Sequence, residues 1–424
     1  MGDVEDRVHG FWKAFGPGLM WAAAAIGVSH LVQSTRAGAM AGFGLAGVIL
    51  IALVLKYPFF EYGPRYAAAT GRSLVEGYRD IGAWALWLYF LMTLVTAVIH
   101  QLAILLFMSF LVRFAFGIDW PVWMLGGAVY GGCVIMLVAG RFRGFDYAVK
   151  FVVAALAVST LVAAAVAAPQ ADWSTIGIWP LPSTGIRLGF LLALVGFMPS
   201  AVEVSVMSSL WTLAKDRTVE KRTSVALARL DFQVGYAGTA VLAFAFLLLG
   251  ATVMYGSGQE FSEAGPVFST QLVELYTRTL GSVTRPLVMV AVLTTIFSTT
   301  LVVIDGFPRA IERCVRNIVA NSELGVDVSL GRSYWLAMLV FGGLNMVGLS
   351  LFTDGLTPMI DFATIFTFAT APVLGYLNLR AVTSIAVPKE HRPGDAMLLL
   401  TYLGLGLLGG TTVIYLASRL FSFL

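Results

Sequence analysis

The sequence predicts an all-helical integral membrane protein with eleven transmembrane spans, and its composition and the spacing of its apolar runs carry that prediction. Hydrophobic residues make up 58% of the 424 residues, charged residues only 12%, and the mean hydropathy is +0.84. Soluble domains are about a quarter charged, so a single soluble core is excluded. Apolar runs of roughly 20 residues, the length of a helix that spans a bilayer, recur along the whole chain.

Each apolar run is expected to form one span. The first run follows the polar start MGDVEDRVHGFWK, so it is expected to be a span rather than a cleavable signal peptide. We expect one transmembrane domain over residues 1–424, present as a monomer in the lipid bilayer. The runs are centred near residues 28, 57, 100, 130, 158, 200, 241, 296, 342, 367 and 408.

Charge placement predicts a multi-pass protein of the cell membrane with a cytoplasmic N-terminus and an outer C-terminus. Alternate connections differ in their content of arginine and lysine, and the positive-inside rule places the richer set in the cytoplasm. The net charge of +3 reflects this asymmetry rather than a surface for nucleic acid. The richer connections are those around residues 62–82, 139–150, 214–230, 306–333 and 380–394.

Several function classes are excluded by the motifs that the chain lacks. It has no GxxxxGK loop, so nucleotide is not an expected partner. Cys133 and Cys314 have neither pairing nor metal-ligand spacing. No enzyme activity is expected, which leaves secondary transport, a channel, or a structural or sensory role in the membrane.

Two spans are interrupted at corresponding positions. The first reads GLMWAAAAIG-VSH-LVQSTRAGAM and the sixth reads GFLLALVGF-MPS-AVEVSVMSSL. Ser29 and Ser200 are expected to cap the second half of each span, and Pro199 lacks the N–H that would continue the helix. Matching interrupted helices indicate a transport site at the membrane midplane. The alternative is that Gly and Pro only kink two packed helices.

The positions of the breaks also predict an inverted repeat of five plus five spans. The first repeat covers residues of about 14–168, the second about 186–380, and an additional eleventh helix about 395–420. The two breaks are expected near residues 27–30 and 196–200.

Five motifs, in order and at matching spacing, carry a family resemblance. They are GPG (16–18), RAGAMAGFGL (36–45), ATGRSL (69–74), MP (198–199) and IDGF (304–307). With them the chain resembles the Nramp metal-ion transporters, and the resemblance runs over most of its length. It implies the LeuT fold, with helices 1 and 6 broken, and secondary active transport by alternating access.

The chain departs from that family at the residues that the resemblance would make functional. The family's third-span aspartate, tied to proton movement, corresponds to Gln101, beside His100. Of the family's metal ligands only the methionine, here Met198, is retained. Where the family has Asp-Pro-Gly-Asn this chain has Gly27, Val28, Ser29 and His30, and where the family has Met-Pro-His it has Met198, Pro199 and Ser200.

These departures lead us to expect an anionic substrate. Mn²⁺ and Fe²⁺ favour carboxylate, carbonyl and imidazole ligands, and desolvating a dication without an anionic ligand is very costly. The helix starts at Ser29 and Ser200 offer free N–H donors and positive dipole ends, which suit an anion. His30 would add a donor, and Arg36 a positive field. A small anion or carboxylate-bearing solute, for example bicarbonate or a small organic acid, is therefore expected.

The alternative substrate is a divalent metal ion of the Mn or Fe type, held by a non-standard ligand set. Met198 and His30 would then contribute ligands, and Glu203 or Asp361 would supply the anionic group. No bound cofactor is expected, and H⁺ and Na⁺ are the candidate coupling ions.

Two readings stay open for each charged or titratable residue in the spans. His30 either lines the site or bonds a backbone carbonyl, and Arg36 either attracts substrate or extends to the outer interface. Glu203 either carries a proton or cation, or closes a capping box with Ser200. The remaining candidates have the same ambiguity: His100 relays protons or packs, Lys56 is a fixed cation or extends to the interface, and Asp361 lines the outer vestibule or caps a helix.

Overall fold

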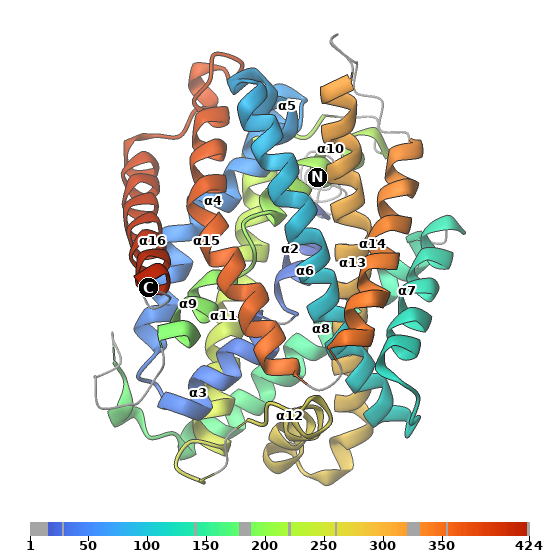
Figure 1. Ribbon diagram of the computed structural model, residues 1–424. Coiled ribbons are helices and arrows are strands. Elements are labelled where there is room, and N and C mark those ends of the chain that lie inside the picture. Colours follow the sequence, from blue (N-terminus) through green and yellow to red (C-terminus); the bar gives the residue numbers. More distant parts are fainter. Residues whose placement is uncertain are drawn as a thin grey trace, which may run out of the picture.

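The helices of the computed structural model follow the predicted spans (Figure 1). The structure describes residues 16–27, 29–139, 142–177, 188–218, 222–258, 261–319, 331–352 and 355–421. The polar start at residues 1–15 and Val28 lie outside these described residues. Seven of the described helices are long and apolar enough to cross a membrane without interruption.

The predicted breaks are present in the first and sixth spans. The first span consists of α2 (Pro17–Ala25), the π-helical turn η1 (Ser29–Ser34) and α3 (Thr35–Ala41), and the sixth consists of α9 (Leu188–Phe197) and α10 (Val204–Thr218). The other spans are α4 (Ala46–Thr70), α6 (Ala83–Phe116), α7 (Val122–Val138), α8 (Phe142–Ala167), α11 (Val225–Val253), α13 (Arg285–Val319), α14 (Arg332–Leu351), α15 (Leu356–Val382) and α16 (Asp395–Phe421).

Two shorter helices lie at opposite ends of the bundle and were not predicted. The amphipathic helix α5 (Leu74–Ile81) follows α4 at the upper end in Figure 1, and α12 (Gly265–Leu280) lies with α3 at the lower end. The apolar spans hold them in place, because α5 packs against α6 and α15, and α12 packs against α6 and α13.

Glycines let the broken first span approach its neighbour α11 at backbone distance. A Cβ added to Gly38 would lie 2.1 Å from the carbonyl oxygen of Leu247, and one added to Gly250 would lie 2.1 Å from that of Thr35. Small residues of this kind allow close packing between helices in a membrane. Gly38, the first of the three glycines in RAGAMAGFGL, therefore has a packing function.

The GPG motif opens α2 against an acidic side chain of α11. The carboxylate of Asp231 accepts bonds from the backbone N–H of Gly16 at 3.3 Å and of Gly18 at 2.7 Å. A negative charge at a helix start satisfies free N–H groups and complements the helix dipole. The first half of the broken span is thus anchored at its N-terminal end, away from the break.

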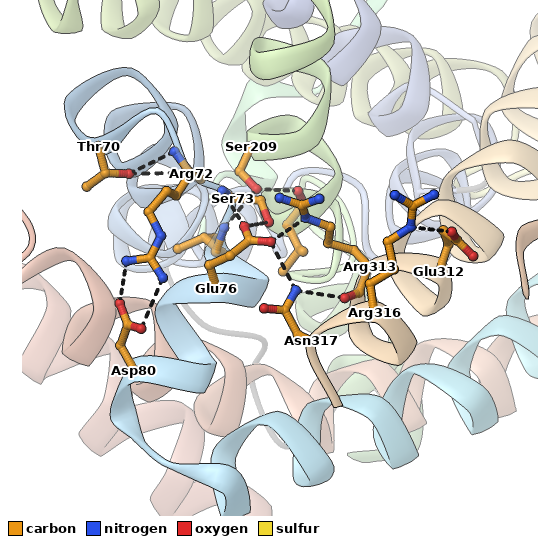
Figure 2. A network of polar contacts seen from close by, with 12 residues as sticks. Thr70, Arg72, Ser73, Glu76, Asp80, Ser209, Glu312, Arg313, Arg316 and Asn317 are labelled. Carbon is orange, nitrogen blue, oxygen red and sulfur yellow. Dashed lines mark hydrogen bonds and ion pairs between the residues drawn. The ribbon is translucent and has the colours of Figure 1, made fainter. Parts of the chain in front are cut away.

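A polar network around α5 closes the upper end of the bundle (Figure 2). Glu76 accepts bonds from the N–H of Ser73 at 2.7 Å and from Asn317 of α13 at 3.0 Å, and it pairs with Arg313 of the same helix. The N–H of Leu74 donates to the hydroxyl of Ser209 on α10 at 3.2 Å. A single short helix therefore connects the second half of the sixth span to the eighth span.

We expect Glu76→Ala to lower the free energy of unfolding by about 3 kcal/mol, because it leaves the buried Arg313 without its carboxylate. Thermal unfolding of the purified protein in detergent measures this. The matched control is Asp80→Ala, which breaks the exposed Arg72–Asp80 pair, 38% and 37% accessible, and should change stability by less than about 1 kcal/mol. Equal losses in the two variants would contradict a connecting role for Glu76.

Candidate functional site

The first break differs in detail from its prediction. The α-helical winding ends at Ala25, and Gly27 lies so close to α13 that an added Cβ would be 2.7 Å from the Thr299 hydroxyl oxygen. The Ser29 hydroxyl donates back to the Ala25 carbonyl, so it does not cap the following helix as expected. The hydroxyl therefore satisfies a backbone carbonyl at the end of α2, and the chain continues as a π-helical turn.

The second break is longer than predicted. It runs from Met198 through a cis Met198–Pro199 peptide to Glu203, and α10 begins at Val204 rather than at Ser200. The expected capping box is not formed, because Glu203 stands directly before the helix. Its Oε1 accepts a bond from Thr370 of α15 at 3.3 Å, and its buried Oε2 has no hydrogen-bond partner.

Lys56 of α4 enters this second break as a fixed cation. Its ammonium group donates to the carbonyl oxygens of Val195 at 3.1 Å, Gly196 at 2.7 Å and Ser200 at 3.1 Å. The side chain is fully buried, which decides between the two readings of this residue. It does not extend to the membrane interface.

A small cavity of about 30 Å³ lies where the two breaks meet α6 and α13. A space of this size holds about two water molecules or a single ion. Its lining is mostly apolar, with a few polar groups from each of these segments. It is lined by Ala24, Ala25, Ser29, His100, Ile104, Phe197, Ser200, Ala201, Glu203, Val204, Met207, Thr299, Val302, Val303 and Phe307.

Four of the predicted site residues line this cavity: Ser29, His100, Ser200 and Glu203. The imidazole of His100 bonds the hydroxyl of Thr367 at 2.6 Å. The other described candidates lie outside the lining and are Gly27, His30, Arg36, Lys56, Gln101, Met198, Pro199 and Asp361.

The ring of His30 points away from the cavity. Its Nε2 lies 2.9 Å from the carbonyl oxygen of Thr239, and its Nδ1 lies 2.9 Å from that of Ala25 and 2.6 Å from the Ser29 hydroxyl. Each ring nitrogen thus lies within hydrogen-bonding distance of a backbone carbonyl oxygen, Nδ1 near the first span and Nε2 near α11. His30 therefore connects the first span to α11.

Gln101 bonds away from the cavity too. Its Nε2 donates to the carbonyl of Val303 at 3.5 Å, and its Oε1 accepts a bond from Asn345 of α14 at 2.9 Å. Of the two neighbouring residues of the third span, only His100 faces the cavity.

Arg36 and Asp361 form an ion pair at the α3 end of the bundle. Two guanidinium nitrogens donate to the two carboxylate oxygens at 2.6 and 3.1 Å, and Gln33 donates to the same carboxylate at 3.1 Å. The side chains are 12% and 28% accessible. The Arg36 guanidinium also lies 4.9 Å from the centre of the Phe190 ring of α9. The pair thus joins the first, sixth and tenth spans at the α3 end of the bundle.

Sequence reasoning missed Met207 and Thr299 as lining residues. Met207 lies one helical turn after Glu203, and that i, i+4 spacing is a signal the sequence contains. Thr299 belongs to an intramembrane run of hydroxyl residues, Ser298 to Thr300. Among the described residues no group of three or more His, Cys, Asp or Glu side chains gathers to hold a metal.

A bundle with two broken helices around a central cavity defines a membrane transporter rather than an enzyme. The chain belongs to the Nramp family, since residues 18–418 match the family described as natural resistance-associated macrophage protein-like. The predicted family is therefore confirmed.

Relatives and solved structures agree with this assignment. An uncharacterised Pasteurella multocida protein is 34% identical over 97% of this chain and 93% of its own length. The divalent metal cation transporter MntH of Deinococcus radiodurans is 25% identical over 77% of this chain and 71% of its own length. An Eremococcus coleocola manganese transporter superposes with a TM-score of 0.74 at 15% identity, covering 96% of this chain and 87% of that one, which confirms the fold class.

We expect His30→Ala to destabilise the protein without changing which solutes it moves. It removes two buried hydrogen bonds of about 1 kcal/mol each, so unfolding should become easier by on the order of 2 kcal/mol. Thermal unfolding and relative uptake rates of different solutes are the two measurements. Altered selectivity at unchanged stability would place the ring in the substrate path.

We expect the Arg36–Asp361 pair to contribute a coupling energy of about 1 kcal/mol, because it is partly buried and bidentate. A double-mutant cycle with Arg36→Gln and Asp361→Asn, followed by thermal unfolding at low and high salt, isolates that energy. The coupling should shrink as salt rises. The exposed Arg278–Glu274 pair serves as the control, with less than about 0.5 kcal/mol. Additive losses for Arg36 and Asp361 would contradict the pairing.

Proposed function

We propose that this Nramp-family protein is a secondary active transporter of a divalent metal cation, with Glu203 as the charged ligand. The observation that supports this is the buried Oε2 of Glu203, which has no hydrogen-bond partner in a cavity between the two broken helices. A buried carboxylate oxygen without a donor is costly to maintain, and a cation in the cavity would satisfy it.

The expectation of an anionic substrate is not supported by the site. His30 was expected to donate to the anion, but its ring nitrogens face backbone carbonyls. Arg36 was expected to provide a positive field, but its charge is matched by Asp361. The acidic Glu203 lines the cavity and would repel an anion there.

The lining offers donors that first-row divalent metals accept. They are the carboxylate of Glu203, the imidazole of His100, the hydroxyls of Ser29 and Ser200 and the thioether of Met207. Carboxylate and imidazole suit Mn²⁺ and Fe²⁺, and the softer thioether adds selectivity against Mg²⁺ and Ca²⁺. The divalent metal cation transporter named among the relatives favours the same substrate class.

The two closures at the ends of the bundle suit alternating access. The Glu76 network closes the α5 end, and the Arg36–Asp361 pair closes the α3 end. We assign the α5 end to the cytoplasm, following the positive-inside rule, which keeps the N-terminus inside and the C-terminus outside. H⁺ or Na⁺ would be the coupling ion.

Glu203→Gln tests the function in proteoliposomes. The amide keeps the size of the side chain and loses its charge, so Mn²⁺ uptake should fall about 10- to 100-fold, equivalent to about 1.5–3 kcal/mol for a charged contact. Uptake of Mn²⁺, Fe²⁺, bicarbonate and small organic acids is compared with and without a pH gradient.

The control for this experiment is Glu274→Gln, which makes the same chemical change on the exposed face of α12 and should leave uptake unaltered. Mn²⁺ uptake by Glu203→Gln at the parent rate would contradict the role of this ligand. Uptake of an anion but no metal by the parent protein would contradict the proposed substrate class.

A further inference from the structure

Three backbone carbonyls at the second break surround the nitrogen of Lys56. They belong to Val195, Gly196 and Ser200, at 3.1, 2.7 and 3.1 Å from Nζ. An ammonium group has three N–H donors, so each donor has one carbonyl. A neutral amine would have only two donors, and the geometry therefore fits the charged form.

The chain places these oxygens here because the sixth span is interrupted. The last four carbonyls of a helix have no intrahelical donor and carry the negative end of its dipole. Val195 and Gly196 belong to this last turn of α9, and Ser200 follows in the break. A Cβ on Gly196 would lie 2.2 Å from the carbonyl oxygen of Thr364, so α9 is held tightly on α15.

One further group favours a positive charge at this point. The ring of Phe60 is centred 5.7 Å from Nζ, within the range of a cation–π contact. The described bonds of Lys56 all go to carbonyls, and those of the Glu203 carboxylate go to other groups. The ammonium thus has its own oxygen ligands and leaves the carboxylate to the cavity.

We propose that the carbonyls of Val195, Gly196 and Ser200, here called the carbonyl cage, form a binding site for a monovalent ammonium-type cation. Lys56 is its covalently attached occupant. Rings of backbone carbonyls are a general way to replace the hydration shell of a monovalent cation. The protein therefore carries its own cation at the sixth-span break and needs no free ion there. The importance of the cage for transport rests on the proposed function, whereas cation binding to it does not.

Chemical rescue of Lys56→Ala tests the cage. Alanine retains the Cβ, so the substitution empties the cage and the space of three methylene groups, and n-propylammonium can replace both. Thermal unfolding of the purified variant should move upward by several degrees with n-propylammonium chloride, less with methylammonium, and not with n-propanol, which has the same chain without the charge. Metal uptake, lost in the variant, should return with n-propylammonium.

Two variants serve as controls. Lys56→Met keeps an unbranched chain in the channel without the charge, so no amine should stabilise it or restore uptake. Lys389→Ala removes an exposed lysine and should show no response to n-propylammonium. If Lys56→Ala can be purified folded only when n-propylammonium is present during expression, that also supports the cage.

The cage is overturned if n-propanol stabilises Lys56→Ala as well as n-propylammonium does, because the effect is then only the filling of space. It is equally overturned if the amine neither stabilises nor recovers the variant. Stabilisation by the amine in a protein whose parent moves no metal would support the cage and contradict the proposed function, so the two failures are distinguishable.

Discussion

The interrupted sixth span depends on opposite charges at its two inner ends. The carbonyl end of α9 receives the ammonium of Lys56, and the amide end of α10 follows the carboxylate of Glu203. Each charge complements the dipole of the half-helix that it meets. An unwound segment at membrane depth is tolerated only where its polar groups are satisfied inside the protein. Lys56 satisfies three of the backbone carbonyls at this break from inside the protein.

The two charged side chains at the sixth-span break differ in their bonding. Lys56 is fully occupied by carbonyls, so its position is fixed by the protein itself. Glu203 has one oxygen bonded to Thr370 and one without a partner, so it can still bind a ligand. The cavity is about the size of one ion, and an ion pair lies toward each end of the bundle.

The sequence was sufficient to predict the spans and the two breaks, because both depend on local patterns of apolar, Gly and Pro residues. It could not identify the partners of Lys56, since these are backbone carbonyls that no side-chain pattern reveals. It placed both Ser29 and His30 in the site, whereas only Ser29 lines the cavity. A π-helical turn holds more residues than an α-helical one, so a gapless residue-by-residue match can misassign which side chain faces inward. The i, i+4 spacing from Glu203 would have predicted Met207 as a lining residue.

The close contact between α3 and α11 limits how this molecule can move. At Gly38 and Gly250 the two backbones meet with no side chain between them. Sliding one helix along the other would therefore drive a carbonyl oxygen of one helix into a side chain of the other. We therefore expect the two helices to move together as one unit, with any opening at the α3 end occurring where Arg36 meets Asp361 of α15 and Phe190 of α9.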